Sequence, residues 1–208
     1  EGLFEELLLA VFNDDAEEVS RLHSLGAPIN MKDYPAEGHG STPLQYAIVH
    51  GCNETIRLLL SLGVDVNKGD HFNNTALFYC AEYGDAETAK TLLGMGADIS
   101  VRDEVTGCSV LHTAAYRNRN EIVRMLVDAG AEVDAVDEPT GETPLFYAAI
   151  EGWTDTVELL LSLGADPCAC NAVNYQPYLS AQEWDHWETS QVLIQAMGPK
   201  YTKLKPNT

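Results

Sequence analysis

The 208-residue chain carries 32 acidic and 12 basic residues, which gives a formal net charge of -20 at pH 7, and 45% of its residues are hydrophobic. This charge repels phosphate backbones and anionic lipid head groups over about 8 Å at physiological salt, so neither nucleic acid nor a membrane surface is an expected partner. No Gly/Ser-rich or Pro-rich stretch interrupts the chain, which predicts a single domain.

The cysteines and the apolar runs indicate the environment of the protein. Its five cysteines are odd in number and lack a disulfide-like spacing, which favours a reducing compartment, the cytoplasm or the nucleus. No secretory leader pattern follows the first residue, Glu1, so we expect no secretory signal and a fragment of a longer chain. No apolar run approaches the roughly 18 residues of a membrane helix, so a soluble protein is expected.

Taken in chain order, the sequence repeats one unit. The stretches "TPLQYAIVHG" at Thr42, "TALFYCAEYG" at Thr75, "SVLHTAAYRN" at Ser109 and "TPLFYAAIEG" at Thr143 are versions of one pattern. Its leucines recur 33 or 34 residues apart, at Leu44, Leu77, Leu111, Leu145 and Leu179. A period of this length indicates a solenoid of stacked repeats. We predict one domain over 1–198 with six repeats, at approximately 4–36, 37–70, 71–103, 104–137, 138–171 and 172–198, and a flexible tail at 199–208.

Each copy predicts two helices and an extended finger. A hydroxyl residue opens the first helix in the four regular copies, where its oxygen can accept a hydrogen bond from a free backbone amide, and proline follows it at Pro43 and Pro144. Small residues such as Ala47 and Cys80 then let neighbouring inner helices approach closely. The second helix has apolar residues at helical spacing and ends at a glycine that suits a left-handed backbone. Those glycines are Gly63, Gly96, Gly130 and Gly164.

The pattern T-P-L-H-x-A-A-x-x-G, second helix, G-A-D-x-N is similar to that of the ankyrin repeat family across nearly the whole chain. This resemblance implies an all-α repeat solenoid, an ankyrin array of about six helix-turn-helix repeats with β-hairpin-like fingers. The two ends depart from the pattern. The first copy lacks the T-P entry, and in the last copy, aligned on Leu179, Gln182 and Glu183 replace the alanine pair. Such atypical copies are expected of caps.

The resemblance also places a binding surface, because partners of ankyrin repeats usually bind the concave face made by the fingers and the inner helices. The contact positions at the ends of the inner helices are Val49, His50, Glu82, Tyr83, Tyr116, Arg117, Ile150, Glu151, Trp184 and Asp185. Tyrosines that border the same groove are Tyr46, Tyr79 and Tyr147, and finger positions in the third copy are His71, Phe72 and Asn74. We expect a non-enzymatic, monomeric module that binds a protein or peptide.

Aromatic and acidic residues in this set favour a basic or aromatic-anchored partner. For the bordering tyrosines, packing against the next inner helix is an equal alternative. The acids that support a cationic partner, unless they are merely solvated, are Asp70, Glu82, Asp103, Glu104, Asp137, Glu138, Glu142, Glu151 and Asp185. Two narrower hypotheses are a methyl-lysine reader, with Trp184 or with Tyr83 and Tyr116, and enzymatic hydroxylation of Asn67, which occupies the finger asparagine modified in this family.

Motifs for catalysis are missing from the sequence: it has no GxxxxGK[ST] loop, no HExxH and no GxSxG. Cys168 and Cys170 form C-x-C without a paired Cys or His cluster, so no metal and no cofactor are predicted. His112 matches the structural histidine of the family pattern. The alternative function is a small-molecule-binding or catalytic groove lined by Tyr79, Tyr83 and Tyr116, and a third possibility is a recognition arm of a larger protein.

Overall fold

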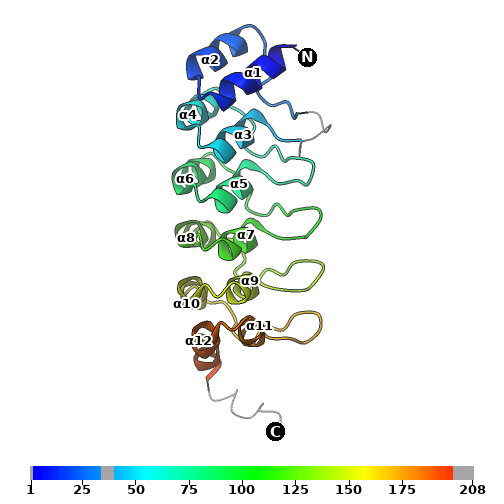
Figure 1. The fold of residues 1–208 in the computed structure, drawn as a ribbon, viewed down its shortest axis with the longest axis vertical. Helices are drawn as coiled ribbons and strands as arrows, with labels where there is room; N and C mark the ends of the chain where they lie inside the picture. Colours follow the sequence, from blue (N-terminus) through cyan, green and yellow to red (C-terminus); the bar gives the residue numbers. More distant parts are fainter. Residues whose placement is uncertain (1, 34–39, 199–208) are drawn as a thin grey trace. The chain divides into compact units, whose positions relative to one another are not determined.

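The computed structural model describes residues 2–33 and 40–198 (Figure 1). The predicted tail at 199–208 and residues 34–39, between the first two helix pairs, lie outside the described residues. The chain falls into two compact units, Glu1–Val105 and Thr106–Thr208. The single domain and the repeat boundaries stay predictions.

Unit 1 consists of three helix pairs. Its helices are α1 (Gly2–Phe12), α2 (Ala16–Ser24), α3 (Pro43–His50), α4 (Asn53–Ser61), α5 (Ala76–Tyr83) and α6 (Ala86–Gly94). The inner helices α1, α3 and α5 pack side by side in one row, and each also packs against its own outer helix. Figure 1 shows the fingers leaving the inner helices on the side away from the outer helices.

Unit 2 repeats the same arrangement. Its helices are α7 (Val110–Tyr116), α8 (Asn120–Asp128), α9 (Pro144–Ile150), α10 (Thr154–Ser162), α11 (Pro177–Glu183) and α12 (Trp187–Met197). Here α7, α9 and α11 form the inner row, and α8, α10 and α12 form the outer row. The twelve helices of the described residues confirm the predicted all-α repeat solenoid.

Small residues at one repeated position let the inner helices pack closely. Ala47, Cys80, Ala114 and Ala148 are each 0% exposed. A larger side chain there would push neighbouring helices apart, because protein interiors are packed at crystal-like density. The predicted role of this position is therefore confirmed.

The inner helices differ in how their first turns are capped. Thr42 and Ser109 form capping boxes. The hydroxyl oxygen of each accepts the backbone N–H of the residue three positions later, and its own backbone N–H donates to the side chain of that residue, Gln45 or His112. Thr75 and Thr143 make no side-chain cap, and the residue three positions later is phenylalanine in both copies. The predicted hydroxyl caps are thus confirmed in two of the four regular copies.

His112 shows why the polar side chain is useful. Its Nδ1 accepts the backbone N–H of Ser109 at 3.1 Å, so the proton lies on Nε2, which donates to the carbonyl of Glu142 at 3.0 Å. The ring is fully buried. It joins the start of α7 to the base of the following finger, which is a structural role.

Two kinds of turn next to the helices have a left-handed backbone, and finger residues such as Asn73 and Gly107 have one as well. The outer helices end at glycines such as Gly164, with φ at 98°, as predicted. The turn between the two helices of a pair is also left-handed, with glycine in three copies and Asp14, Asn118 or Asp185 in the others. The backbone of these three residues adopts a conformation that costs about 1–2 kcal/mol for an L-residue. Part of this cost is relieved when a short polar side chain forms a local hydrogen bond.

The alignment of the last copy on Leu179 is wrong by one residue. Pro177 takes the first helical position of α11, as Pro144 does in α9, so Tyr178 stands where Leu145 stands. Tyr178 is buried at 8% exposure, whereas Leu179 is only partly buried. A buried aromatic residue thus fills the leucine position in this copy.

The turn of the last pair moves with this correction. Asp185, with φ at 61°, occupies the place of Gly152, with φ at 72°. His186, which the alignment on Leu179 would place at the glycine position, is instead the residue that precedes α12. Trp184 therefore corresponds to Glu151.

The fingers are hairpin-like in path but contain no β-strand in the residues that the structure describes. Backbone hydrogen bonds join neighbouring fingers within a unit, such as Glu104 N–H to the Phe72 carbonyl at 2.9 Å. Close approach also requires glycine: at Gly107 a Cβ would lie 2.7 Å from the backbone nitrogen of Glu138. Turns within each finger, and hydrogen bonds and close contacts between neighbouring fingers, thus stand in place of a continuous β-ladder.

Across the described ranges 2–33 and 40–198, no helix is long and apolar enough to cross a membrane.

Candidate functional site

Three tyrosines of the inner helices bind the fingers through hydrogen bonds. In each case the tyrosine hydroxyl donates to an aspartate of the finger that precedes the same helix. The pairs are Tyr46 with Asp33, Tyr79 with Asp70, and Tyr147 with Asp137, and the last two hydrogen bonds measure 2.9 Å. All three tyrosines are half-buried. Their hydroxyl groups are therefore used within the fold.

The aspartates organise the finger backbone. Asp70, only 4% exposed, accepts the N–H groups of Phe72 and Asn74 through Oδ1, both at 2.9 Å. Asp137, at 3% exposure, accepts the N–H of Glu142 at 2.9 Å in the same way. One carboxylate thus fixes the turn and, through tyrosine, joins it to the helix.

The pKa values follow from this burial and bonding. Burial opposes ionisation of Asp137, but hydrogen bonds from Thr140, Glu142 and Tyr147 outweigh it and lower the pKa of the carboxyl. Burial, followed by the hydrogen bond to Asp33, raises the pKa of Tyr46 to about 12. The tyrosines therefore stay protonated donors while Asp137 is a charged acceptor.

The acids proposed from the sequence as contacts for a cationic partner divide into two groups. Asp70 and Asp137 are buried and bonded, so their assignment to a partner is wrong. Asp103 and Glu142 accept amide hydrogen bonds from the neighbouring finger's Asn74 and Asn171, at 2.8 and 3.1 Å. The exposed acids of the predicted set are Glu104, Glu138 and Asp185, and Glu82 and Glu151 are partly exposed.

Aromatic side chains of unit 1 gather on the finger-side surface of its inner helices. We call this set the aromatic face: Phe12 of α1, Tyr46 and His50 of α3, and Tyr79 and Tyr83 of α5. The ring of Phe12 lies 4.4 Å from that of His50 and 5.4 Å from that of Tyr46, centroid to centroid. Because α1 packs on α3 and α3 on α5, the aromatic face runs across three consecutive repeats.

The same ring geometry recurs in two neighbouring helices. Tyr46 and His50 stack with centroids 6.5 Å apart and planes within 4°, and Tyr79 and Tyr83 do so with the same values. The second ring of each pair, His50 or Tyr83, is exposed, and the exposed fraction of Tyr83 is 50%. The bonded tyrosine therefore supports a second ring that faces solvent.

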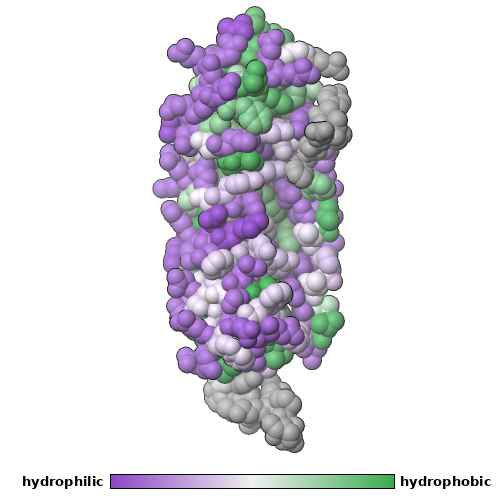
Figure 2. All heavy atoms as spheres, in the orientation of Figure 1, coloured by the Kyte–Doolittle hydropathy of each residue, from purple (hydrophilic) through white to green (hydrophobic). Residues whose placement is uncertain are grey.

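Apolar residues extend this surface along α1. Leu9 is 63% exposed and Phe12 is 47% exposed. Figure 2 shows hydrophobic residues gathered over α1 and α3. Exposed apolar patches of this kind mark interaction sites in soluble proteins.

The predicted finger residues of the third copy have different roles. The exposed ring of His71 packs on Gly40, leaving no room for a Cβ there. Phe72 is 37% exposed near the tip of the finger. Asn74 is used in the fold, because its side-chain amide donates to Asp103 and its carbonyl accepts from Gln45.

In unit 2 the predicted residues Tyr147 and Arg117 lie beside Tyr116, which is 37% exposed. Its ring meets that of Tyr147 edge-on at 6.1 Å, and the guanidinium of Arg117 lies 5.1 Å from its centroid. The indole N–H of Trp153 donates to the Tyr116 carbonyl at 2.8 Å.

The remaining positions lie at the ends of inner helices. Val49 and Ile150 are partly buried in α3 and α9, and Glu151 directly follows α9. Trp184, which follows α11, is 64% exposed. Asn67 is engaged in the backbone of the next finger, since its Oδ1 accepts the N–H of Asp98 at 2.8 Å.

Three exposed aromatic residues were missed from the sequence: Phe12, Trp153 and Trp187, exposed by 47%, 37% and 57%. Phe12 occupies the position of Val49 one repeat earlier, so the repeat alignment could have identified it. The tryptophans lie at turns between helices, which the family's concave positions do not include.

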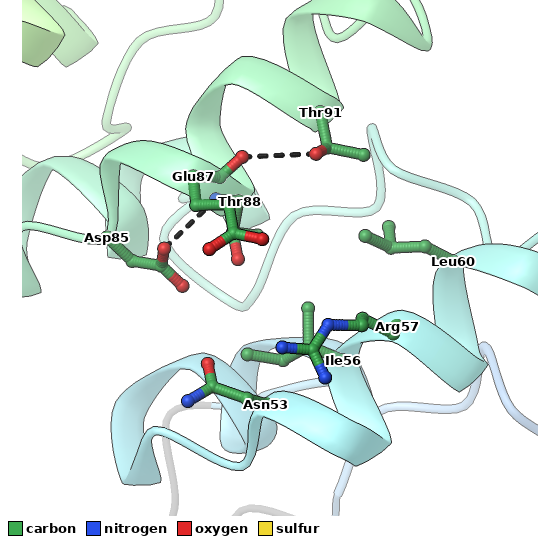
Figure 3. Close-up of a pocket in the computed structure, with 8 residues that line it drawn as sticks. All are labelled: Asn53, Ile56, Arg57, Leu60, Asp85, Glu87, Thr88 and Thr91. Atoms are coloured by element: carbon green, nitrogen blue, oxygen red, sulfur yellow. Dashed lines mark hydrogen bonds between the residues drawn. The ribbon is translucent and has the colours of Figure 1, made fainter.

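A pocket of about 170 Å³ lies between the outer helices α4 and α6 (Figure 3). Ile56 and Leu60 contribute its apolar wall, and Arg57 and Glu87 approach it from opposite helices. Its other lining residues are Asn53, Asp85, Thr88 and Thr91. None of these belongs to the predicted site.

No group of three or more His, Cys, Asp or Glu residues that could hold a metal ion occurs within residues 2–33 and 40–198. The five cysteines are free, and burial raises the pKa of the Cys80 thiol.

The chain matches the family model described as "Ankyrin repeats (3 copies)" over residues 7–103 and again over 96–171. No match was found among curated proteins.

Proposed function

Because the chain belongs to the ankyrin repeat family, whose repeats are generally protein–protein interaction modules, we propose that it is a non-enzymatic module for binding a protein or peptide. The proposed contact surface is the aromatic face with the adjoining finger residues His71 and Phe72. Unit 2 contributes Tyr116, Arg117, Ile150, Glu151 and Trp184 as further contact positions.

The observation that carries this proposal is the composition of the inner helices in unit 1. Helices α1, α3 and α5 carry the exposed rings of Phe12, His50 and Tyr83 together with three glutamates, and contain no lysine or arginine. Aromatic rings supply a large contact area at low entropic cost and are typical anchors of binding energy. Rigid rings held by the Tyr79–Asp70 hydrogen bond are ordered before the partner arrives, which reduces the entropic cost of binding.

A basic partner fits the charge of this surface. Among the described residues of unit 1, the ion pairs of Arg21 with Glu18 and of Arg57 with Glu54 lie on the outer helices α2 and α4. The net charge of -20 also attracts a cationic partner from a distance and raises its association rate. The partner is therefore a basic peptide or domain with aromatic or aliphatic anchors.

The alternatives have less support. One alternative is a small-molecule groove lined by Tyr79, Tyr83 and Tyr116. Against it, the hydroxyl of Tyr79 already donates to Asp70, and the described pocket lies between the outer helices α4 and α6, away from these tyrosines. A methyl-lysine cage and hydroxylation of Asn67 rest on residue type alone. We also propose a monomeric array in a reducing compartment, the cytoplasm or the nucleus, in keeping with its free thiols.

Affinity capture from cell lysate tests the proposal. The immobilised chain is compared with a His50→Ala, Tyr83→Ala variant and with a Lys90→Ala control on outer helix α6, all checked by circular dichroism. We expect a protein that is retained by the wild type and the control, lost by the double variant, and released as salt rises from about 0.1 M to about 1 M. Equal retention by all three would place binding elsewhere on the chain.

A further inference from the structure

All three tryptophans of the protein lie close to two neighbouring turns of unit 2. Trp153 precedes α10, Trp184 follows α11, and Trp187 begins α12. Their exposed fractions are 37%, 64% and 57%. Tryptophan is highly buried on average, so three exposed indoles in two turns need an explanation.

The two turns lie side by side. The ring of His186 packs on Gly152, leaving no space for a Cβ, and the hydroxyl groups of Thr154 and Thr189 are 2.8 Å apart. The indole of Trp153 is also anchored, because its N–H donates to the Tyr116 carbonyl at 2.8 Å. The tryptophans therefore belong to one surface, which we call the tryptophan surface.

Acidic residues rim the tryptophan surface. Asp155 and Glu188 lie in the first turns of α10 and α12, at corresponding positions one repeat apart. Asp185 is exposed in the second turn, and Glu151 is partly exposed at the first. The sequence from Met125 to Gly198 contains no lysine or arginine.

Three of the earlier outer helices, α4, α6 and α8, carry a basic residue at a position where α10 and α12 carry none, and α2 has Ser20 there. Glu54, at the position of Asp155, forms an ion pair with Arg57 three residues later at 2.8 Å. The third and fourth copies keep a base at that place, Lys90 and Arg124. The corresponding residues in α10 and α12 are Glu158 and Gln191, so neither helix places a cation three residues after its acid.

We propose that the tryptophan surface is a second docking site, for a protein segment rich in arginine or lysine. A cation over an indole face gains about 0.5–2 kcal/mol, and Asp155 and Glu188 supply the complementary charge. The apolar stems of the basic side chains pack on the exposed rings. This site shares Trp184 and Glu151 with the unit 2 contact positions of the proposed function, and it differs from the aromatic face, which belongs to unit 1 and contains no tryptophan.

Tryptophan fluorescence of the full chain tests the proposal, because all three fluorophores lie at this site. The probe is a peptide of alternating arginine and glycine, and the control peptide has glutamine in place of arginine. The arginine peptide is expected to change the tryptophan emission saturably at low salt, with an effect that weakens as salt rises. The glutamine peptide is expected to leave the emission unchanged.

Matched variants locate the effect. Asp155→Asn with Glu188→Gln removes two charges at nearly constant shape, and about a tenfold loss of affinity is expected. Glu158→Arg, which restores the basic position of Arg57, is expected to weaken binding as well. Glu54→Gln is the control in unit 1, and His50→Ala with Tyr83→Ala separates this site from the aromatic face; neither is expected to alter the titration.

Three results would overturn the proposal: no emission change with the arginine peptide, an equal change with the glutamine peptide, or an equal loss of affinity in Glu54→Gln. The second result would assign the surface to an apolar ligand. A loss caused only by the His50→Ala, Tyr83→Ala variant would reassign the peptide to the aromatic face.

Discussion

The hydroxyl of Tyr79 donates a hydrogen bond of 2.9 Å to Oδ2 of Asp70, while Oδ1 of the same carboxylate accepts two backbone N–H groups of its finger. A tyrosine and an aspartate that both looked like partner contacts in the sequence thus stabilise the protein itself. Tyr147 and Asp137 repeat the arrangement in unit 2.

Removing either side of the Tyr79–Asp70 contact should lower stability by different amounts. Tyr79→Phe loses one hydrogen bond and should cost about 1 kcal/mol of unfolding free energy, whereas Asp70→Ala also leaves buried N–H groups unsatisfied and should cost about 2–4 kcal/mol. Urea unfolding measures both. Tyr83→Phe, on the exposed ring, is the control and should change stability by less than about 0.5 kcal/mol. An equal cost for Tyr79→Phe and Tyr83→Phe would show that the hydroxyl of Tyr79 contributes nothing.

The titration of Tyr46 gives a prediction at high pH. Its pKa is raised to about 12 in the folded state from the ordinary value of 10.0, because burial and Asp33 favour the protonated form. The stability from this group is therefore complete below pH 10.0 and is lost as the pH rises toward about 12. The tyrosinate absorbance of the wild type minus that of Tyr46→Phe should titrate near pH 12. A difference spectrum that titrates at the ordinary tyrosine value would rule out the Asp33 contact in solution.

The left-handed turn of the last pair should be improved by glycine. Asp185 has φ at 61°, and Asp185→Gly removes the strain of its Cβ, so thermal unfolding should show a gain of up to about 1 kcal/mol. Gly152→Ala is the opposite test at the corresponding turn, where a Cβ would collide with the His186 ring. That variant should lose more than about 1 kcal/mol. A destabilised Asp185→Gly would indicate that the carboxylate makes a stabilising contact in solution.

The capping difference between repeats is also measurable. Thr42→Ala removes a capping box with Gln45 and should cost about 1 kcal/mol, while Thr75→Ala removes a buried hydroxyl that has no hydrogen-bond partner and should cost less than about 0.5 kcal/mol. Denaturant midpoints of the two variants can be compared directly, because both substitutions delete the same atoms. Equal midpoints would mean that the hydroxyl of Thr75 caps α5 in solution.

The sequence was sufficient for the fold because a repeated core leaves a periodic signal. Leu44, Leu77, Leu111 and Leu145 keep their spacing because each fills the same buried position of its inner helix. In the last copy Tyr178 fills this position instead, and the apolar Leu179 beside it misled the alignment. Pro177, at the helix start, carried the correct register.

The candidate site was less predictable for a different physical reason. Tyrosine suits both a partner and a buried carboxylate, and only the position of the Asp70 and Asp137 side chains decides between these roles. Trp153 and Trp187 lie at turns, where no burial pattern constrains the residue type and periodicity gives no signal. Their exposure can be known only once the neighbouring turns are placed.

Site-specific photo-crosslinking measures where the partner lies. A photoreactive phenylalanine analogue is introduced at Tyr83 in the aromatic face and, in a separate protein, at Lys90 on outer helix α6, and each protein is irradiated with the captured partner. We predict an adduct with a basic segment of the partner from position 83, suppressed at high salt, and none from position 90. An adduct from position 90 alone would show that the partner binds the outer helices and that the aromatic face is not the binding surface.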